Sequence, residues 1–191
     1  MKPVRAAMRS PALLFAALLL LLAASPLAGR AQPGAQARTV PSTLAGTWVH
    51  HGDRERAMRT IDAAFAPTIS RLPQIMHGFA RDQIRSYIEP PRSVRVAIDG
   101  QRVRVVLEAS RETVIDGTLG ARARTRNVES GTRVTPRLQG GWLELLYEGQ
   151  ASEMRQLFST EPDGSQMHLD YTVTAPQIST PVRFRLEYVH P

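Results

Sequence analysis

The feature that most constrains the fold is a period-two alternation of apolar and polar residues that runs from Ser93 to the C-terminal end. Asp99-Gly100 is a tight-turn dipeptide between two alternating runs, 94–98 and 103–107, as in a β-hairpin. Seven more segments continue the pattern: 112–117, 121–128, 132–138, 142–148, 152–159, 165–174 and 182–189. Nine strands with no helical window between them predict an antiparallel barrel or sandwich built from sequential neighbours.

A short strand and a helix are expected before this meander. Residues 46–51 predict the strand, and Asp53 then stands where it would cap a helix. The apolar residues of that helix recur at helical spacing and are Met58, Ile61 and Phe65. Pro67 is expected to end it.

A second helical pattern runs from Leu72 to Ile88, with Pro73 in its first turn and Pro90-Pro91 after its end. The sequence therefore predicts two amphipathic helices within residues 53–88, each with one face that must be buried.

The N-terminal residues have the layout of a secretory signal peptide. Three basic residues precede a 13-residue apolar run at 12–24, which is too short to span a bilayer, a task that takes about 20 residues. Small residues follow, so residues 1–37 are expected to be removed by cleavage after Ala31 or Ala37. An uncleaved anchor is the alternative. After cleavage no membrane span is expected, residues 38–45 form a flexible lead, and residues 46–191 form one domain.

The amino-acid composition narrows the range of cell compartments and binding partners. The chain has no cysteine, so an exported fold lacks disulfides and thiol lipidation and depends on its core. The signal accounts for four of the 24 basic residues and none of the 17 acidic ones, which leaves a net charge of +3. Arginines are spread along the chain, which argues against nucleic acid as a partner. The expected location is the periplasm or the outside of the cell.

The order of these elements resembles the intracellular fatty-acid-binding proteins of the calycin group. The residues that carry the resemblance are Gly46-Thr47-Trp48, the helix pair at about 53–88, and VRVAIDGQRVRVV from Val94 to Val106. The resemblance implies an up-and-down barrel of about ten strands, with a helix-turn-helix lid after the first strand and a cavity for a lipid-like guest.

The resemblance also implies an Arg-x-Tyr pair on the last strand that grips a carboxylate inside the barrel. Here Tyr188 shares a strand face with Phe184 and Leu186, whereas Arg183 and Arg185 share the opposite face. The carboxylate clamp is therefore not expected in this chain.

Three further groups of residues could carry metal binding, catalysis or anion binding. Adjacent residues of a strand point to opposite faces, so His50 and His51 do not predict a metal site. His168 and Asp170 share a face as a base and its orienter would, but a solvated polar face opposite the apolar residues of the same strand explains both. Arg122, Arg124 and Arg126 would form an anion site only if they point inward, and solvent exposure is expected. No catalytic residue, metal or cofactor is predicted.

We expect an exported, non-catalytic protein that binds an apolar or amphipathic small molecule, such as a lipid, in the barrel cavity. The candidate cavity and portal residues are Trp48, Phe65, Met76, Phe79, Tyr147, Phe158, Tyr171, Phe184 and Tyr188. One alternative is an interaction or structural protein of the cell envelope with a filled core and no ligand. Another is a barrel hydrolase or isomerase, and the alternative fold is a helix-first α+β cone.

Overall fold

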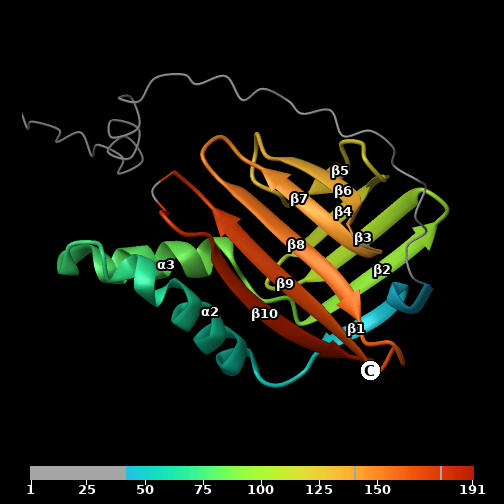
Figure 1. The fold of residues 1–191 in the computed structure, drawn as a ribbon, viewed down its shortest axis with the longest axis horizontal. Helices are drawn as coiled ribbons and strands as arrows, with labels where there is room; N and C mark the ends of the chain where they lie inside the picture. The colour runs from blue at the N-terminus through green and yellow to red at the C-terminus, as the bar shows by residue number, and fades with distance from the viewer. Residues whose placement is uncertain (1–41, 140, 177) are drawn as a thin grey trace, which may run out of the picture. The chain divides into compact units, whose positions relative to one another are not determined.

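The structure is a computed structural model that describes residues 42–139, 141–176 and 178–191. The expected signal peptide and the first part of the expected lead lie outside the described residues. The described chain forms a ten-stranded antiparallel sheet that curls into a nearly closed barrel (Figure 1). The predicted mainly β barrel with two helices after its first strand is confirmed, and the sandwich and the α+β cone are wrong.

The strand bounds follow the alternating sequence pattern closely. They are β1 (Gly46–His50), β2 (Ser93–Asp99), β3 (Arg102–Glu108), β4 (Glu112–Thr118), β5 (Arg124–Arg126), β6 (Arg133–Gln139), β7 (Trp142–Glu148), β8 (Glu153–Thr160), β9 (Gln166–Thr174) and β10 (Val182–Val189). The order across the sheet is β5-β4-β3-β2-β1-β10-β9-β8-β7-β6, so β1 joins the two halves of the meander. All but β5 lie within one residue of the predicted segments.

The seam of the barrel lies between β5 and β6, and it explains why β5 is shorter than the predicted 121–128. Before β5 the chain turns toward β6 instead of β4. The backbone N–H of Gly120 donates to the Pro136 carbonyl at 2.7 Å, and that of Ala123 donates to the Val134 carbonyl at 2.8 Å. These two hydrogen bonds join the edges that the sheet order leaves unpaired.

Helix α2 (Arg54–Ile69) begins at the predicted cap, where the Asp53 carboxylate accepts a hydrogen bond from the Arg56 backbone N–H at 2.6 Å. The prediction that Pro67 ends this helix is wrong, because Pro67 lies inside it. A proline removes only its own N–H, and the Ser70 N–H still donates to the Ala66 carbonyl at 2.9 Å. The chain therefore completes its last turn after the proline.

Helix α3 (His77–Tyr87) starts later than predicted, because a short 3₁₀ turn, η2 (Gln74–Met76), follows Pro73. It ends before Pro90-Pro91, as expected. Figure 1 shows α2 and α3 on one side of the barrel, beside β9 and β10. In the part of the chain that the structure describes, no helix is both long and apolar enough to cross a membrane.

Candidate ligand-binding site

One end of the barrel, called the base here, is closed by Trp48 together with Leu44 of η1 (Ser42–Leu44) and His190. The Trp48 Nε1–H donates to the Leu44 carbonyl at 3.1 Å, and the indole stacks on His190 with ring centroids 3.9 Å apart. Trp48, Phe158 and Tyr188 are each 0% exposed, so no water-sized gap touches them. The base is tightly packed.

The opposite end, called the mouth, is lined by residues toward the other ends of the antiparallel strands β7 to β10. Tyr171 on β9 and Phe184 on β10 are register partners, and their rings stack with centroids 4.6 Å apart. Phe65 of α2 approaches Phe184 with a centroid distance of 6.4 Å. Helix α2 therefore reaches the aromatic side chains of the mouth.

A buried polar cluster, formed by Tyr147, Gln156 and Tyr171, lies in this aromatic surrounding. The Tyr147 hydroxyl donates to the Gln156 Oε1 at 2.9 Å. Gln156 is the register partner of Tyr171 and interacts with the Tyr171 hydroxyl. Burial raises the pKa of both phenols. The contact with Gln156 lowers the pKa of Tyr171, but by less than burial raises it. Both phenols therefore stay neutral at physiological pH.

The two helices form a lid whose halves are held very differently. Helix α2 buries a full face against the barrel core: Ala57, Ile61, Phe65 and Ile69. No residue of α3 is buried, and only Ala80 and Ile84 pack partly against the core. Polar contacts add to this packing. Arg85 of α3 binds Asp62 of α2 through two hydrogen bonds of 2.5 and 3.3 Å, and Arg71, in the turn after α2, binds the Ser179 hydroxyl.

The structure brings seven of the nine predicted site residues into the interior or onto its roof: Trp48, Phe65, Tyr147, Phe158, Tyr171, Phe184 and Tyr188. Met76 and Phe79 lie instead on the lid surface, 37% and 45% exposed. The sequence-based list omits Gln156. Its inward-facing position between Met154 and Phe158 was the available signal, since a polar residue on an apolar strand face needs a partner.

The arginines of the last strand lie outside the barrel, as period two predicted. Val182, Phe184, Leu186 and Tyr188 are buried, whereas Arg183 and Arg185 are exposed. Arg185 forms a bidentate pair with Asp170 of β9, with distances of 2.7 and 2.9 Å. The family's carboxylate clamp therefore has no counterpart on β10.

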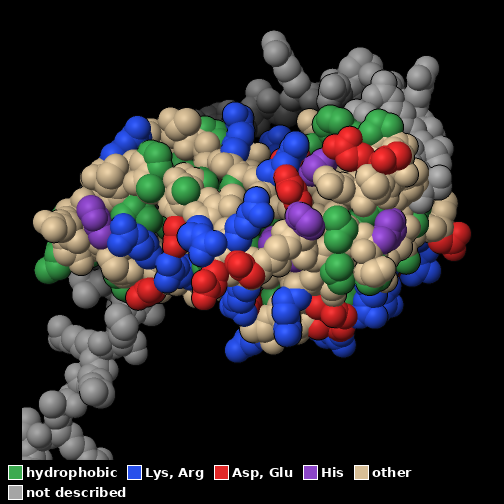
Figure 2. All heavy atoms as spheres, turned by 90° about the horizontal axis from the view of Figure 1, so that it is seen from below, with side chains coloured by type: hydrophobic (Ala, Val, Ile, Leu, Met, Phe, Trp, Pro, Cys, Tyr) green, Lys and Arg blue, Asp and Glu red, His purple; other side chains and the backbone are tan. Residues whose placement is uncertain are grey.

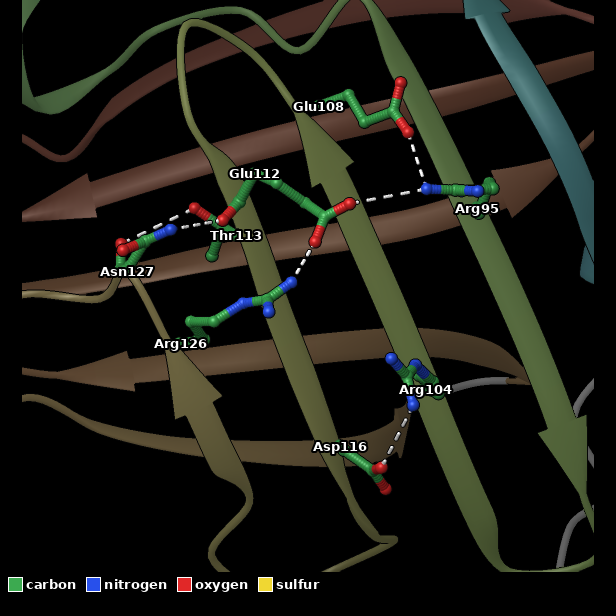
Figure 3. Close-up of polar contacts among 8 residues, drawn as sticks. All are labelled: Arg95, Arg104, Glu108, Glu112, Thr113, Asp116, Arg126 and Asn127. Atoms are coloured by element: carbon green, nitrogen blue, oxygen red, sulfur yellow. Dashed lines mark hydrogen bonds and ion pairs between the residues drawn. The ribbon is translucent and has the colours of Figure 1, made fainter.

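Arginines on the outer face of β2 to β5 are paired with carboxylates (Figure 3). Arg95 lies 2.6 Å from Glu108 and 3.5 Å from Glu112, and Arg126 also pairs with Glu112. Arg126 thus points outward, as expected. Arg122 and Arg124 are exposed as well, so the three arginines form no inward-facing anion site. Figure 2 shows basic and acidic side chains interspersed over the face seen from below.

His50 and His168 have structural partners. The His50 Nδ1 lies 3.2 Å from the Gly52 carbonyl, at the predicted strand end before the cap of α2. His168 Nε2 lies 2.7 Å from Glu161, whereas Asp170 is bound to Arg185, so the base-and-orienter pair is not assembled. Among the described residues no cluster of three or more metal-binding side chains occurs.

Two pockets defined by described residues both lie outside the interior. One of about 400 Å³ lies against the outer face of β1 to β4, beside Arg95, Arg104 and Glu112. The other, of about 250 Å³, lies between the start of α2 and Pro90-Pro91. Neither includes a residue of the polar cluster.

Comparison with known proteins bears on the fold. No family model matches the sequence, and no curated protein matches it either. Among solved structures, a secretary abundant heat soluble protein from Ramazzottius varieornatus matches 78% of this chain and 96% of its own, at 11% identity and a TM-score of 0.51.

Other matches have lower TM-scores. The REP1-NXSQ fatty acid transporter has 15% identity and a TM-score of 0.46, covering 78% of this chain and 96% of its own. Fatty-acid-binding protein 1 of Echinococcus granulosus has 12% identity and a TM-score of 0.45, covering 77% and 96%. The first of these structures, the heat soluble protein, shares the fold of this chain, a barrel with a helical lid, and at 11% identity the likeness extends to the fold alone.

Proposed function

We propose that this chain is an exported, non-catalytic protein that binds an apolar or amphipathic small molecule at the mouth of its barrel. The observation that carries the proposal is the difference between the two ends of the interior. The base is filled by fully buried side chains, whereas the mouth combines apolar rings with a buried hydrogen-bonding cluster beneath a lid. An apolar site with a few convergent polar groups is the usual design of a small-molecule site.

Entry would take place beneath α3. This helix contributes no buried residue. Arg85 pairs with Asp62 of α2, and Arg71, in the turn between α2 and η2, contacts the Ser179 hydroxyl. Exposed pairs of this kind contribute little stability, so opening α3 costs far less than opening α2, which buries Phe65 and Ile61. The guest would then contact Phe184 and Tyr171.

Non-catalytic binding is favoured because the side chains best suited to catalysis are engaged elsewhere. His168 and Asp170 are bound to Glu161 and Arg185 on the outer face, away from the mouth. The second candidate function is an interaction protein of the cell envelope. The closely packed interior and the exposed Ile75, at 90%, favour that alternative.

Native mass spectrometry of the full-length chain, expressed in a Gram-negative host and purified from its periplasm, tests the proposal. We expect recovery from the periplasm, an N-terminus at Gln32 or Arg38, and a bound mass that is lost on denaturation. The purified protein should also bind the apolar dye N-phenyl-1-naphthylamine. Ile75→Ser is the matched control, because it removes an exposed apolar side chain of the lid and leaves the interior intact.

Three outcomes would contradict the proposal. A retained signal sequence in the cytoplasm would contradict export. A bare mass together with no dye binding would favour the interaction protein. Dye binding that Ile75→Ser abolishes would place the dye on the lid surface instead of the mouth.

A further inference from the structure

The polar cluster at the mouth can both donate and accept hydrogen bonds. Tyr147 donates to Gln156, and Gln156 is paired with Tyr171 across β8 and β9. Each phenol carries one donor and acceptor lone pairs, and an amide carries two donors and an acceptor oxygen. The bonds already made leave capacity in the cluster for one further polar partner, such as a ligand headgroup.

The cluster lies in surroundings without a positive charge that could compensate an anionic ligand. The polar or charged residues that are buried among the described ones are Thr135, Glu144 and Gln156. Glu144 alternates with the inward-facing Leu143 and Leu145 and lies 4.0 Å from Arg155, which is on the outer side of the barrel. No arginine is buried in the described part of the chain. Gln156 is thus the polar group that the mouth offers besides the two phenols.

An ionised headgroup would be costly in such a place. Moving a carboxylate from water to an apolar environment without a cation costs far more than moving a hydroxyl that regains hydrogen bonds. Tyr147 and Tyr171 remain neutral donors, because burial raises the pKa of both hydroxyls. A hydroxyl, amide or ester headgroup would match the cluster in both charge and hydrogen-bonding capacity.

We infer that Tyr147, Gln156 and Tyr171 select a neutral amphiphile, with an uncharged hydrogen-bonding headgroup on an apolar chain, over an ionised fatty acid. The inference rests on the proposed function, because it assigns the ligand class for the same site. It identifies Gln156, through its position between the two phenols, as the residue that determines specificity.

Competition for N-phenyl-1-naphthylamine at pH 8 tests this selection. Dodecanol, dodecanamide and laurate have the same chain length and differ in headgroup, and only laurate is charged at this pH. We expect the wild type to prefer dodecanol and dodecanamide over laurate by at least tenfold. Tyr147→Phe, Tyr171→Phe and Gln156→Leu keep the shape of the mouth and should each weaken dodecanol binding about three- to tenfold, the effect of one lost hydrogen bond.

Thr135→Val is the matched control. It also removes a buried hydroxyl, but one on the outer face of the barrel, because Thr135 pairs with Leu146, which alternates with the inward-facing Leu145 and Tyr147. Dodecanol affinity should stay within twofold of the wild type in this variant. Far-ultraviolet circular dichroism of each variant shows that the barrel is folded before its affinity is compared.

The outcomes separate this inference from the proposed function. Failure of the wild type to bind the dye would overturn the proposed function and the inference with it. Dye binding with equal competition by dodecanol and laurate would overturn the headgroup assignment alone. Equal losses in Thr135→Val and in the three cluster variants would also overturn it, because the effect would then be general destabilisation.

Discussion

Gly117 and Ala123 meet at the seam of the barrel so closely that a Cβ on Gly117 would lie 2.8 Å from the Ala123 Cβ and 2.9 Å from its Cα. Real Cβ atoms do not approach backbone so closely, and Ala123 cannot withdraw because its N–H is bound to the Val134 carbonyl. The absence of a side chain at position 117 therefore lets the segment before β5 pack against β4 while it hydrogen-bonds to β6.

Gly117→Ala should destabilise the fold by about 1–3 kcal/mol, because the added methyl group forces the seam apart. Urea unfolding followed by tryptophan fluorescence measures this. Gly78→Ala is the matched control. Gly78 lies in α3, where an added Cβ would have no neighbour within 4 Å, so the change should be neutral or stabilise by up to about 1 kcal/mol. A Gly117→Ala variant as stable as Gly78→Ala would contradict the assigned role of the seam.

The seam also illustrates what the sequence could predict and what it could not. Alternation assigns the inward face of every long strand, because one buried face enforces period two along the whole strand. Alternation overestimated the length of β5, because the backbone before Arg124 hydrogen-bonds to β6 instead of β4. That pairing depends on a tertiary contact between Gly117 and Ala123.

The candidate site was predictable to a similar degree. Period two placed Tyr147, Tyr171 and Phe184 inside correctly. The Tyr147–Gln156 hydrogen bond depends on the register of β7 on β8, which alternation alone does not specify. The apolar face of α3 was recognisable too, but the core is covered by α2, so Met76 and Phe79 remain at the surface.

Acid should weaken the contact that Glu89 makes between the start of α2 and the turn after β3. Burial alone would raise the pKa of Glu89, but hydrogen bonds from the Ser110 hydroxyl and N–H, and the Arg54 guanidinium 2.6 Å away, lower it below its ordinary value of 4.5. A lowered pKa in the folded state stabilises the protein above the unfolded pKa, and that contribution is lost as the pH falls through the folded value.

Glu89→Gln should therefore flatten the loss of stability below about pH 5 while costing stability at pH 7. The measurement is the urea midpoint as a function of pH for both proteins. Glu55→Gln is a suitable comparison, because Glu55 is 88% exposed and its nearest cation, Arg59, is 3.7 Å away. Parallel pH profiles for the wild type and Glu89→Gln would contradict this role.

The Asp62–Arg85 pair should govern the opening of α3. Asp62→Asn removes the charge that Arg85 contacts through two hydrogen bonds. Amide hydrogens of α3 should then exchange faster, while those of α2 keep their protection, because α2 is anchored by its buried face. Salt should have the same effect on the wild type, since it screens exposed ion pairs. Unchanged exchange in α3 would show that other contacts hold this helix.

The contrast between base and mouth leads to a prediction on two phenylalanines that face the same interior. Phe158 at the base is 0% exposed and surrounded by packed side chains, whereas Phe184 at the mouth lies beneath the lid, where Phe65 approaches it. Phe158→Leu should lower the free energy of unfolding by about 1–3 kcal/mol, because the base cannot collapse around the cavity that the lost ring leaves.

Phe184→Leu should cost less in stability but should weaken binding of N-phenyl-1-naphthylamine several-fold, while Phe158→Leu leaves that affinity unchanged. Urea unfolding measures the stability of both variants, and dye titration measures their affinity for the dye. If Phe158→Leu alters dye binding as strongly as Phe184→Leu, the ligand reaches the base, and the division of the interior into a filled base and a binding mouth is wrong.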